Sequence, residues 1–207
     1  MENRISVKKV LITLVGILLI GTAVAFNAGA SLGNDPVGIF YDGIRSILKL
    51  EAAQLGMASN VVNISLVILL FFVGRHYVNL GTVIYIVPYG TCVSIGSMLY
   101  SKIFVSDALF VRILGSTVGC LLLCLGVAVF IVADIGMDPM TGVTMVIKDK
   151  TGWDYKRAKW LFDGIITAIG FICGGKFGVI TVVTILVAGP VIQWMTGKVQ
   201  VLLKDFL

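Results

Sequence analysis

Apolar and polar positions alternate along this chain in long blocks. Apolar residues fill six runs, and each run is close to the roughly 17–25 residues that a helix needs to cross the hydrocarbon core of a membrane. These runs cover residues 8–32, 57–74, 80–100, 109–133, 158–174 and 177–196. Asp163 interrupts the fifth run near its start. The pattern predicts six transmembrane helices.

Two shorter segments, 35–50 and 138–150, stand between these runs and are too short to span a membrane. Both begin with Asp-Pro, which is typical of a helix start, with Asp as the N-cap and Pro in the first helical position. We expect two half-helices, either lying at the membrane interface or re-entering the bilayer from one side.

The half-helices belong to an internal repeat. Three residues of the first half match three of the second at an offset of 103: Gly33, Asp35 and Pro36 with Gly136, Asp138 and Pro139. Later matches fall at offsets of 100 and 99, among them Ala58 with Ala158, Asn63 facing Asp163, and Thr82 with Thr181. Residues 1–103 and 104–207 therefore each predict one spanning helix, one half-helix and two more spanning helices.

Three spanning helices in each half is an odd number, so the second half enters the membrane from the opposite side. The predicted fold is an all-α membrane protein with six transmembrane helices and two short half-helices, arranged as two inverted three-helix repeats. This plan is common among secondary transporters, whose sites lie between the repeats.

Composition and charge agree with a membrane protein. Hydrophobic residues make up 58% of the 207 residues and charged residues only 13%, against about 25% charged in soluble domains. In the predicted topology, most Lys and Arg residues lie on the same side of the membrane as the N-terminus. This asymmetry predicts that both termini are cytoplasmic in a bacterial inner (plasma) membrane. The net charge of +5 thus suits the membrane better than nucleic acid.

The first apolar run resembles a secretory signal peptide, since Lys8 and Lys9 precede the apolar stretch 10–32 and Ala-Val-Ala lies within that stretch. Its length of about 23 residues suffices to span, and it has a counterpart in the second half. We therefore interpret it as the first transmembrane helix.

Short glycine motifs run through both halves. The first half carries Gly33-x-Asp35-Pro36, Gly43, Gly56, Gly81-Thr82 and Gly90, and the second carries Asp138-Pro139, Gly142, Thr151-Gly152 and Gly189-Pro190. Over nearly the whole chain this pattern resembles the YczE/YitT group of bacterial membrane proteins. The resemblance implies a multi-spanning protein and leaves the substrate open.

Residues for enzyme chemistry are sparse. His76 is the one histidine and falls in a short predicted loop, and no zinc, nucleophile-elbow or phosphate-loop motif is present. Cys120 and Cys124 share one helix face, as a metal pair or, as we favour, as small packing residues. We predict no enzyme activity, no cofactor and no metal.

Polar residues at membrane depth are the candidate solute pathway, because such groups are costly in lipid and usually face an interior path. They are Asp35, Asn60, Asn63, Asp138 and Asp163, with helix breaks at Gly33, Pro36, Gly136 and Pro139. We expect a polar cavity between the halves, with Asp35 and Asp138 at opposite mouths and Asn63 and Asp163 on its wall.

Each candidate also has a structural interpretation. Asp35 and Asp138 can serve as N-caps, Asp163 can pair with Lys159 at the cytoplasmic interface, and Asn63 can hold two helices together.

Acidic residues favour a cationic or neutral polar solute, or proton coupling. The sequence therefore predicts a small secondary transporter or carrier for a small polar or cationic solute. The alternative is a non-transporting membrane protein that binds or positions another protein. The expected partners are the lipid bilayer and a small molecule or ion, and a homodimer is left open.

Overall fold

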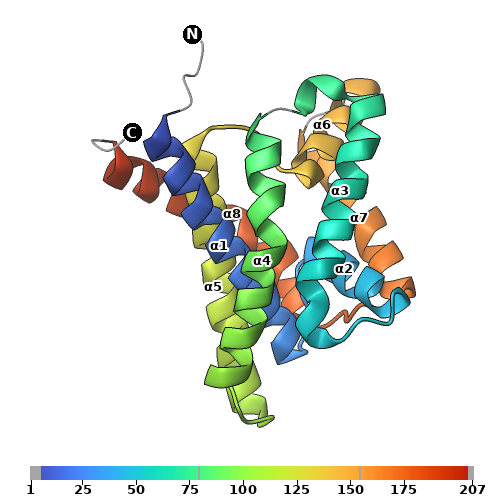
Figure 1. Cartoon of the computed structure of the whole chain (residues 1–207), viewed down its shortest axis with the longest axis vertical. Coiled ribbons are helices and arrows are strands. Elements are labelled where there is room, and N and C mark those ends of the chain that lie inside the picture. Colours follow the sequence, from blue (N-terminus) through green and yellow to red (C-terminus); the bar gives the residue numbers. More distant parts are fainter. Residues whose placement is uncertain (1–5, 79, 154, 205–207) are drawn as a thin grey trace.

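The computed structural model describes residues 6–78, 80–153 and 155–204, and this part of the chain is helical, with no strand (Figure 1). Two 3-10 turns, Ala52–Gln54 and Arg75–Tyr77, flank the third helix. The α-helices are α1 (Val7–Ala30), α2 (Pro36–Ile47), α3 (Leu55–Val73), α4 (Leu80–Ile103), α5 (Leu109–Ala133), α6 (Pro139–Thr151), α7 (Tyr155–Ile172) and α8 (Val179–Leu203).

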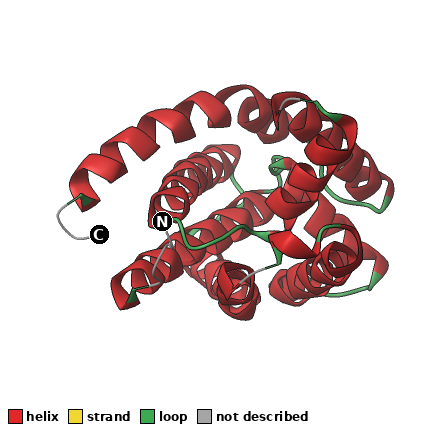
Figure 2. Cartoon of the chain, turned by 90° about the horizontal axis from the view of Figure 1, so that it is seen from above, coloured by secondary structure: helices red, strands yellow, loops and turns green. Residues whose placement is uncertain are grey.

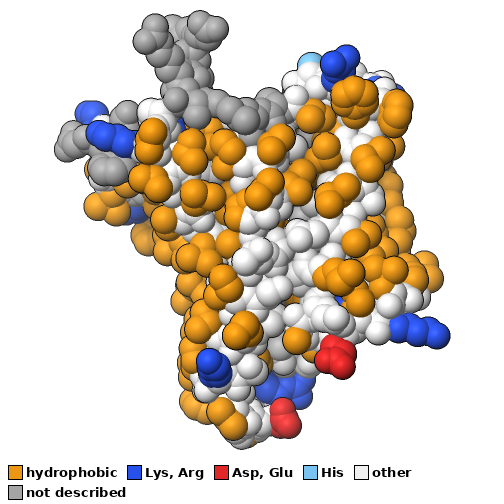
Figure 3. Space-filling view, viewed as in Figure 1, with side chains coloured by type: hydrophobic (Ala, Val, Ile, Leu, Met, Phe, Trp, Pro, Cys, Tyr) orange, Lys and Arg blue, Asp and Glu red, His pale blue; other side chains and the backbone are white. Residues whose placement is uncertain are grey.

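Five helical stretches are long and apolar enough to cross a membrane: α1, residues 52–73, residues 81–103, α5 and α8. Apolar side chains cover the flank of the molecule, and the charged side chains visible in the same view lie toward its ends (Figure 3). Phe72 is 80% exposed and Ile172 is 83% exposed, as expected of side chains that face lipid. The chain is a multi-pass, helical membrane protein.

The sixth predicted span corresponds to α7, which is not among these five because polar residues occupy its first turns. It begins at Tyr155, before the predicted start at 158, and α8 continues to Leu203, beyond the predicted end at 196. Both extensions carry charged or polar residues. The prediction missed them because it placed each helix only where apolar residues form a continuous run. The sequence also predicts Arg4 and Lys156 on the cytoplasmic side. Arg4 and the side chain of Lys156 lie outside the part of the chain that the structure describes.

The two half-helices begin as predicted. The Asp35 carboxylate accepts a hydrogen bond from Val37 N at 3.2 Å, and the Asp138 carboxylate accepts one from Thr141 N at 3.0 Å. Proline follows each aspartate in the first helical turn. With 12 and 13 residues, α2 and α6 are too short to span.

Helices α1 and α5 form the central pair of the bundle, with α4 against α1 and α8 against α5. Their backbones approach closely, since a Cβ on Gly16 would lie 3.1 Å from the Gly126 carbonyl oxygen. Arg112 of α5 donates to the carbonyl oxygens of Ala30 and Ser31 at 2.7 and 2.6 Å. A cation there satisfies acceptors that the end of α1 would otherwise leave unpaired.

The half-helices and α3 and α7 form the other side of the molecule. α2 packs on α7 and α3, and α6 packs on the same two helices. The start of α1 and the end of α8 lie at one end of the molecule (Figure 1). Seen from above, α8 is a long curved helix along one side of the bundle (Figure 2).

Candidate functional site

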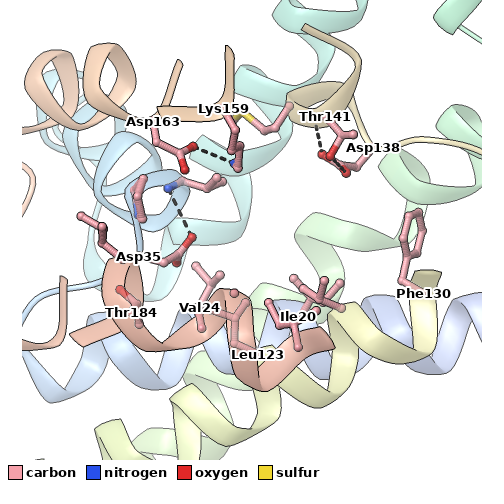
Figure 4. A pocket seen from close by; sticks show the side chains of 18 of the residues that line it. Ile20, Val24, Asp35, Leu123, Phe130, Asp138, Thr141, Lys159, Asp163 and Thr184 are labelled. Atoms are coloured by element: carbon pink, nitrogen blue, oxygen red, sulfur yellow. Dashed lines mark hydrogen bonds and ion pairs between the residues drawn. The ribbon is translucent and has the colours of Figure 1, made fainter. Parts of the chain in front are cut away.

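A cavity of about 1320 Å³ lies where these two groups of helices face each other. α1 and α5 supply one wall, α7 and α8 supply another, and α4 contributes two tyrosines. The starts of α2 and α6 reach it from different sides, with Asp35 and Asp138 across the open space from each other (Figure 4). The cavity thus collects side chains from both halves of the chain.

The backbone breaks before the half-helices are built on glycine. Gly33 has φ of 105° and Gly136 has φ of 152°. Residues with a Cβ atom rarely adopt such positive φ values, whereas glycine adopts them readily. A Cβ on Gly33 would also lie 2.7 Å from Gly178 N, at the start of α8. At the other break, the Thr82 hydroxyl at the start of α4 donates to Met137 O at 3.1 Å. The start of α8, in the second half, therefore packs against the break before α2. The start of α4, in the first half, contacts the break before α6.

Among the described residues of this cavity wall, Asp35 carries the one carboxylate oxygen that is both buried and without a hydrogen-bond partner. Its Oδ2 accepts from Val37 N, while Oδ1 is buried and has no partner in the described chain. Asp35 lies between α1 and α2, outside the long apolar helices. Burial raises the pKa of this carboxyl to about 6, although the nearby Lys159 ammonium acts in the opposite direction. Asp35 can therefore change charge near neutral pH.

The other predicted acids are already engaged. Asp138 accepts from both the amide and the hydroxyl of Thr141, at 3.0 and 2.6 Å. Asp163 accepts from the Lys159 ammonium at 2.7 Å, one helical turn away. The N-cap of Asp138 and the ion pair of Asp163 with Lys159 are thus both present, and both aspartates also line the cavity.

Asn60 and Asn63 lie off the cavity. Asn60 accepts a hydrogen bond from Gly90 N at 3.1 Å, which links α3 to α4. Asn63 is fully buried and accepts from the Tyr41 hydroxyl at 3.1 Å, which links α3 to α2. Neither is brought together with Asp35, Asp138 and Asp163.

The wall is mainly apolar and aromatic, whereas we expected a polar one. Tyr85 and Tyr89 of α4 stack with ring centroids 4.9 Å apart, and Phe130 of α5 meets Tyr85 edge-on at 5.4 Å. Sequence analysis missed these residues. The i, i+4 spacing of the two tyrosines places them on one helix face, but the apolar run around them hides which face is inward.

Comparison with known protein families identifies the family of this chain. A family of unknown function, DUF6198, matches residues 7–197. The chain belongs to the DUF6198 family. No curated protein and no solved structure matches it. The DUF6198 match covers both Asp-Pro breaks and every cavity residue named above.

The side chains that line this cavity are of kinds that can bind a solute. Within the described residues, no group of three or more His, Cys, Asp or Glu side chains could hold a metal ion. The cavity offers carboxylates, one ammonium, hydroxyls and aromatic rings. Such a set can hold a solute by charge and by apolar contact, which is the usual composition of a ligand pocket.

Proposed function

We propose that this protein is a small secondary carrier, built from two inverted three-helix repeats, that moves a small polar or cationic solute through the cavity between them. The observation that carries the proposal is the convergence of both Asp-Pro breaks and Asp163 on one cavity. Carriers with inverted repeats bind their solutes where discontinuous helices meet.

Packing contacts that recur between the halves support the repeat. A Cβ on Gly16 would lie 3.1 Å from the Gly126 carbonyl oxygen, and a Cβ on Gly119 would lie 3.2 Å from the Ala23 carbonyl oxygen. Gly119 and Gly126 follow Gly16 and Ala23 by the same 103 residues. Exchange of the two halves therefore turns the first contact into the second.

A second pair of contacts obeys the same exchange. A Cβ on Gly174 would lie 2.7 Å from Ser46 Oγ, and a Cβ on Gly74 would overlap the Val146 side chain. Here each residue of the second half follows its mate by 100. A two-fold relation between the halves explains both pairs with one operation.

The route of α7 supports a sixth span. It begins shortly after the end of α6, and near its own C-terminal end Gly170 packs on the Ile39 backbone of α2. α7 therefore runs from one half-helix to the other. With α7 as a span, the termini lie on one side of the membrane, in keeping with the shared end of α1 and α8. We place that side in the cytoplasm of a bacterial inner membrane, because the larger set of Lys and Arg lies there.

The test of the carrier is electrical. Purified protein in proteoliposomes on a solid-supported membrane would be exposed to a panel of organic and inorganic cations, with and without an imposed proton gradient. We expect transient currents for at least one cation, and loss of these currents in Asp35→Asn. Asparagine is as good an N-cap as aspartate, so this variant keeps the start of α2.

Asp107→Asn is the matched control, because Asp107 is an exposed loop aspartate away from the cavity. Its currents should equal those of the unchanged protein. Absence of current for every cation, from protein that is folded by its thermal melt, would contradict the proposal and favour the non-transporting alternative.

A further inference from the structure

We propose that the cavity binds a bulky organic cation, with an apolar or aromatic body around a delocalised or quaternary positive charge. This inference rests on the proposed carrier and names its substrate class. Three features of the cavity support it: the rings on its wall, its balance of charge, and the gap through which it meets the apolar phase.

The rings supply the apolar surface. Among the described residues, six aromatic side chains from three helices and the loop before α8 line the cavity: Tyr85, Tyr89, Phe130, Trp160, Phe171 and Phe177. Ring faces attract cations through their quadrupole. A small hydrated cation cannot exploit this surface, because it would have to shed its water to reach it.

The charges on the cavity wall favour a cationic ligand over an anionic one. Four aspartates and one lysine line the cavity among the described residues: Asp35, Asp134, Asp138, Asp163 and Lys159. Lys159 is paired with Asp163 at 2.7 Å. Asp35 offers a buried carboxylate oxygen with no protein partner, and a buried acceptor of this kind is expensive unless a ligand or water satisfies it. An anion would meet this excess of negative charge at close range.

A gap between α7 and α8 gives the ligand access from the apolar phase. In the first half, α3 and α4 are closely packed, and a Cβ on Gly56 would overlap the Gly90 carbonyl oxygen. The corresponding helices α7 and α8 scarcely touch along their described residues. A Cβ on Gly164 or on Gly189, both cavity-lining, would have no described atom within 4 Å.

The probe pair that tests this inference is tetraphenylphosphonium and tetraphenylborate, which share shape and apolar surface but carry opposite charge. Binding would be measured by equilibrium dialysis against the full chain in lipid nanodiscs, with empty nanodiscs as background. Tetramethylammonium, a small cation, would serve as competitor. Asp35→Asn and the control Asp107→Asn would be measured beside the unchanged protein.

We expect saturable binding of tetraphenylphosphonium, about tenfold weaker in Asp35→Asn and unchanged in Asp107→Asn. Tetraphenylborate should show no saturable component, and tetramethylammonium should compete at least about a hundredfold less well. Equal or tighter binding of tetraphenylborate would overturn the sign of the charge. Equal competition by tetramethylammonium would overturn the inference that the ligand has an apolar body. Unchanged binding of tetraphenylphosphonium to Asp35→Asn would overturn the inference that Asp35 is part of the binding site.

The inference and the carrier can fail separately. If tetraphenylphosphonium does not bind while a different cation drives currents, the substrate class is overturned and the carrier stands. If tetraphenylphosphonium binds through Asp35 while no cation of the panel gives a current, the binding site stands and the carrier is overturned.

Discussion

Gly90 and Gly189 occupy matching positions in α4 and α8, 99 residues apart, yet their surroundings differ. A Cβ on Gly90 would overlap the amide group of Asn60 on α3, whereas a Cβ on Gly189 would meet no described atom within 4 Å. We therefore expect Gly90→Ala to destabilise the protein and Gly189→Ala to leave it unchanged or slightly more stable.

The magnitude follows from the contacts. In Gly90→Ala the Asn60 side chain must move and give up the hydrogen bond from Gly90 N, a loss of about 1 kcal/mol. Overpacking between α3 and α4 adds about 1–3 kcal/mol, and the better helix propensity of alanine returns about 1 kcal/mol. The net loss is about 2 kcal/mol. Gly189→Ala should gain up to about 1 kcal/mol, because only the propensity changes.

Equilibrium unfolding by SDS in mixed micelles, followed by tryptophan fluorescence, measures both free energies of unfolding. Gly164→Ala, on the other side of the same gap, is a second control and should behave like Gly189→Ala. If Gly90→Ala and Gly189→Ala lower the free energy of unfolding by the same amount, α8 packs on α7 as closely as α4 packs on α3. The open gap would then be refuted.

Three further predictions concern charge, packing and topology. Tetraphenylphosphonium affinity should fall about tenfold as the pH drops from 7 to 5, because Asp35, with its pKa of about 6 beside Lys159 and Asp163, loses its charge; dialysis of Asp35→Asn should give a flat profile, and a falling one would exclude Asp35 as the titrating group. Thr82→Val should lower the free energy of unfolding by about 1 kcal/mol through loss of the bond to Met137 O, with Thr82→Ser unaffected; equal stability of the two variants would dismiss the contact. Reporter fusions after Arg75 and after Lys204 should both give a cytoplasmic signal, whereas opposite signals would show that α7 does not cross.

Local features of the fold were predictable from the sequence. The apolar runs fix where helices lie because lipid demands about 20 apolar residues in a row. The Asp-Pro pairs fix where α2 and α6 begin because an N-cap needs only its own next few residues. Five of the six predicted spans meet the length and composition of a transmembrane helix, and both half-helices start at the predicted aspartates.

The direction in which helical side chains point was not predictable in the same way. Asn60 and Asn63 stand in an apolar run whose periodicity is weak, so nothing local tells which neighbour they face. The structure turns them toward Gly90 and Tyr41. Tyr85 and Tyr89 likewise lie in a run that is apolar on all sides, and only the packing of α4 on α1 turns them inward.

Transport requires that the cavity open to water on both sides of the membrane in turn, and cysteine labelling measures this directly. Ala188→Cys would be made on the cavity wall of α8, with Leu186→Cys, 69% exposed on the outer surface, as the lipid-facing control. Both variants would carry serine in place of Cys92, Cys120, Cys124 and Cys173. In membranes of known orientation, a membrane-impermeant maleimide added to either side should label Ala188→Cys, and saturating tetraphenylphosphonium should slow both reactions, while Leu186→Cys stays unlabelled. Labelling of Ala188→Cys from one side only under every condition, or from neither side, would contradict the carrier.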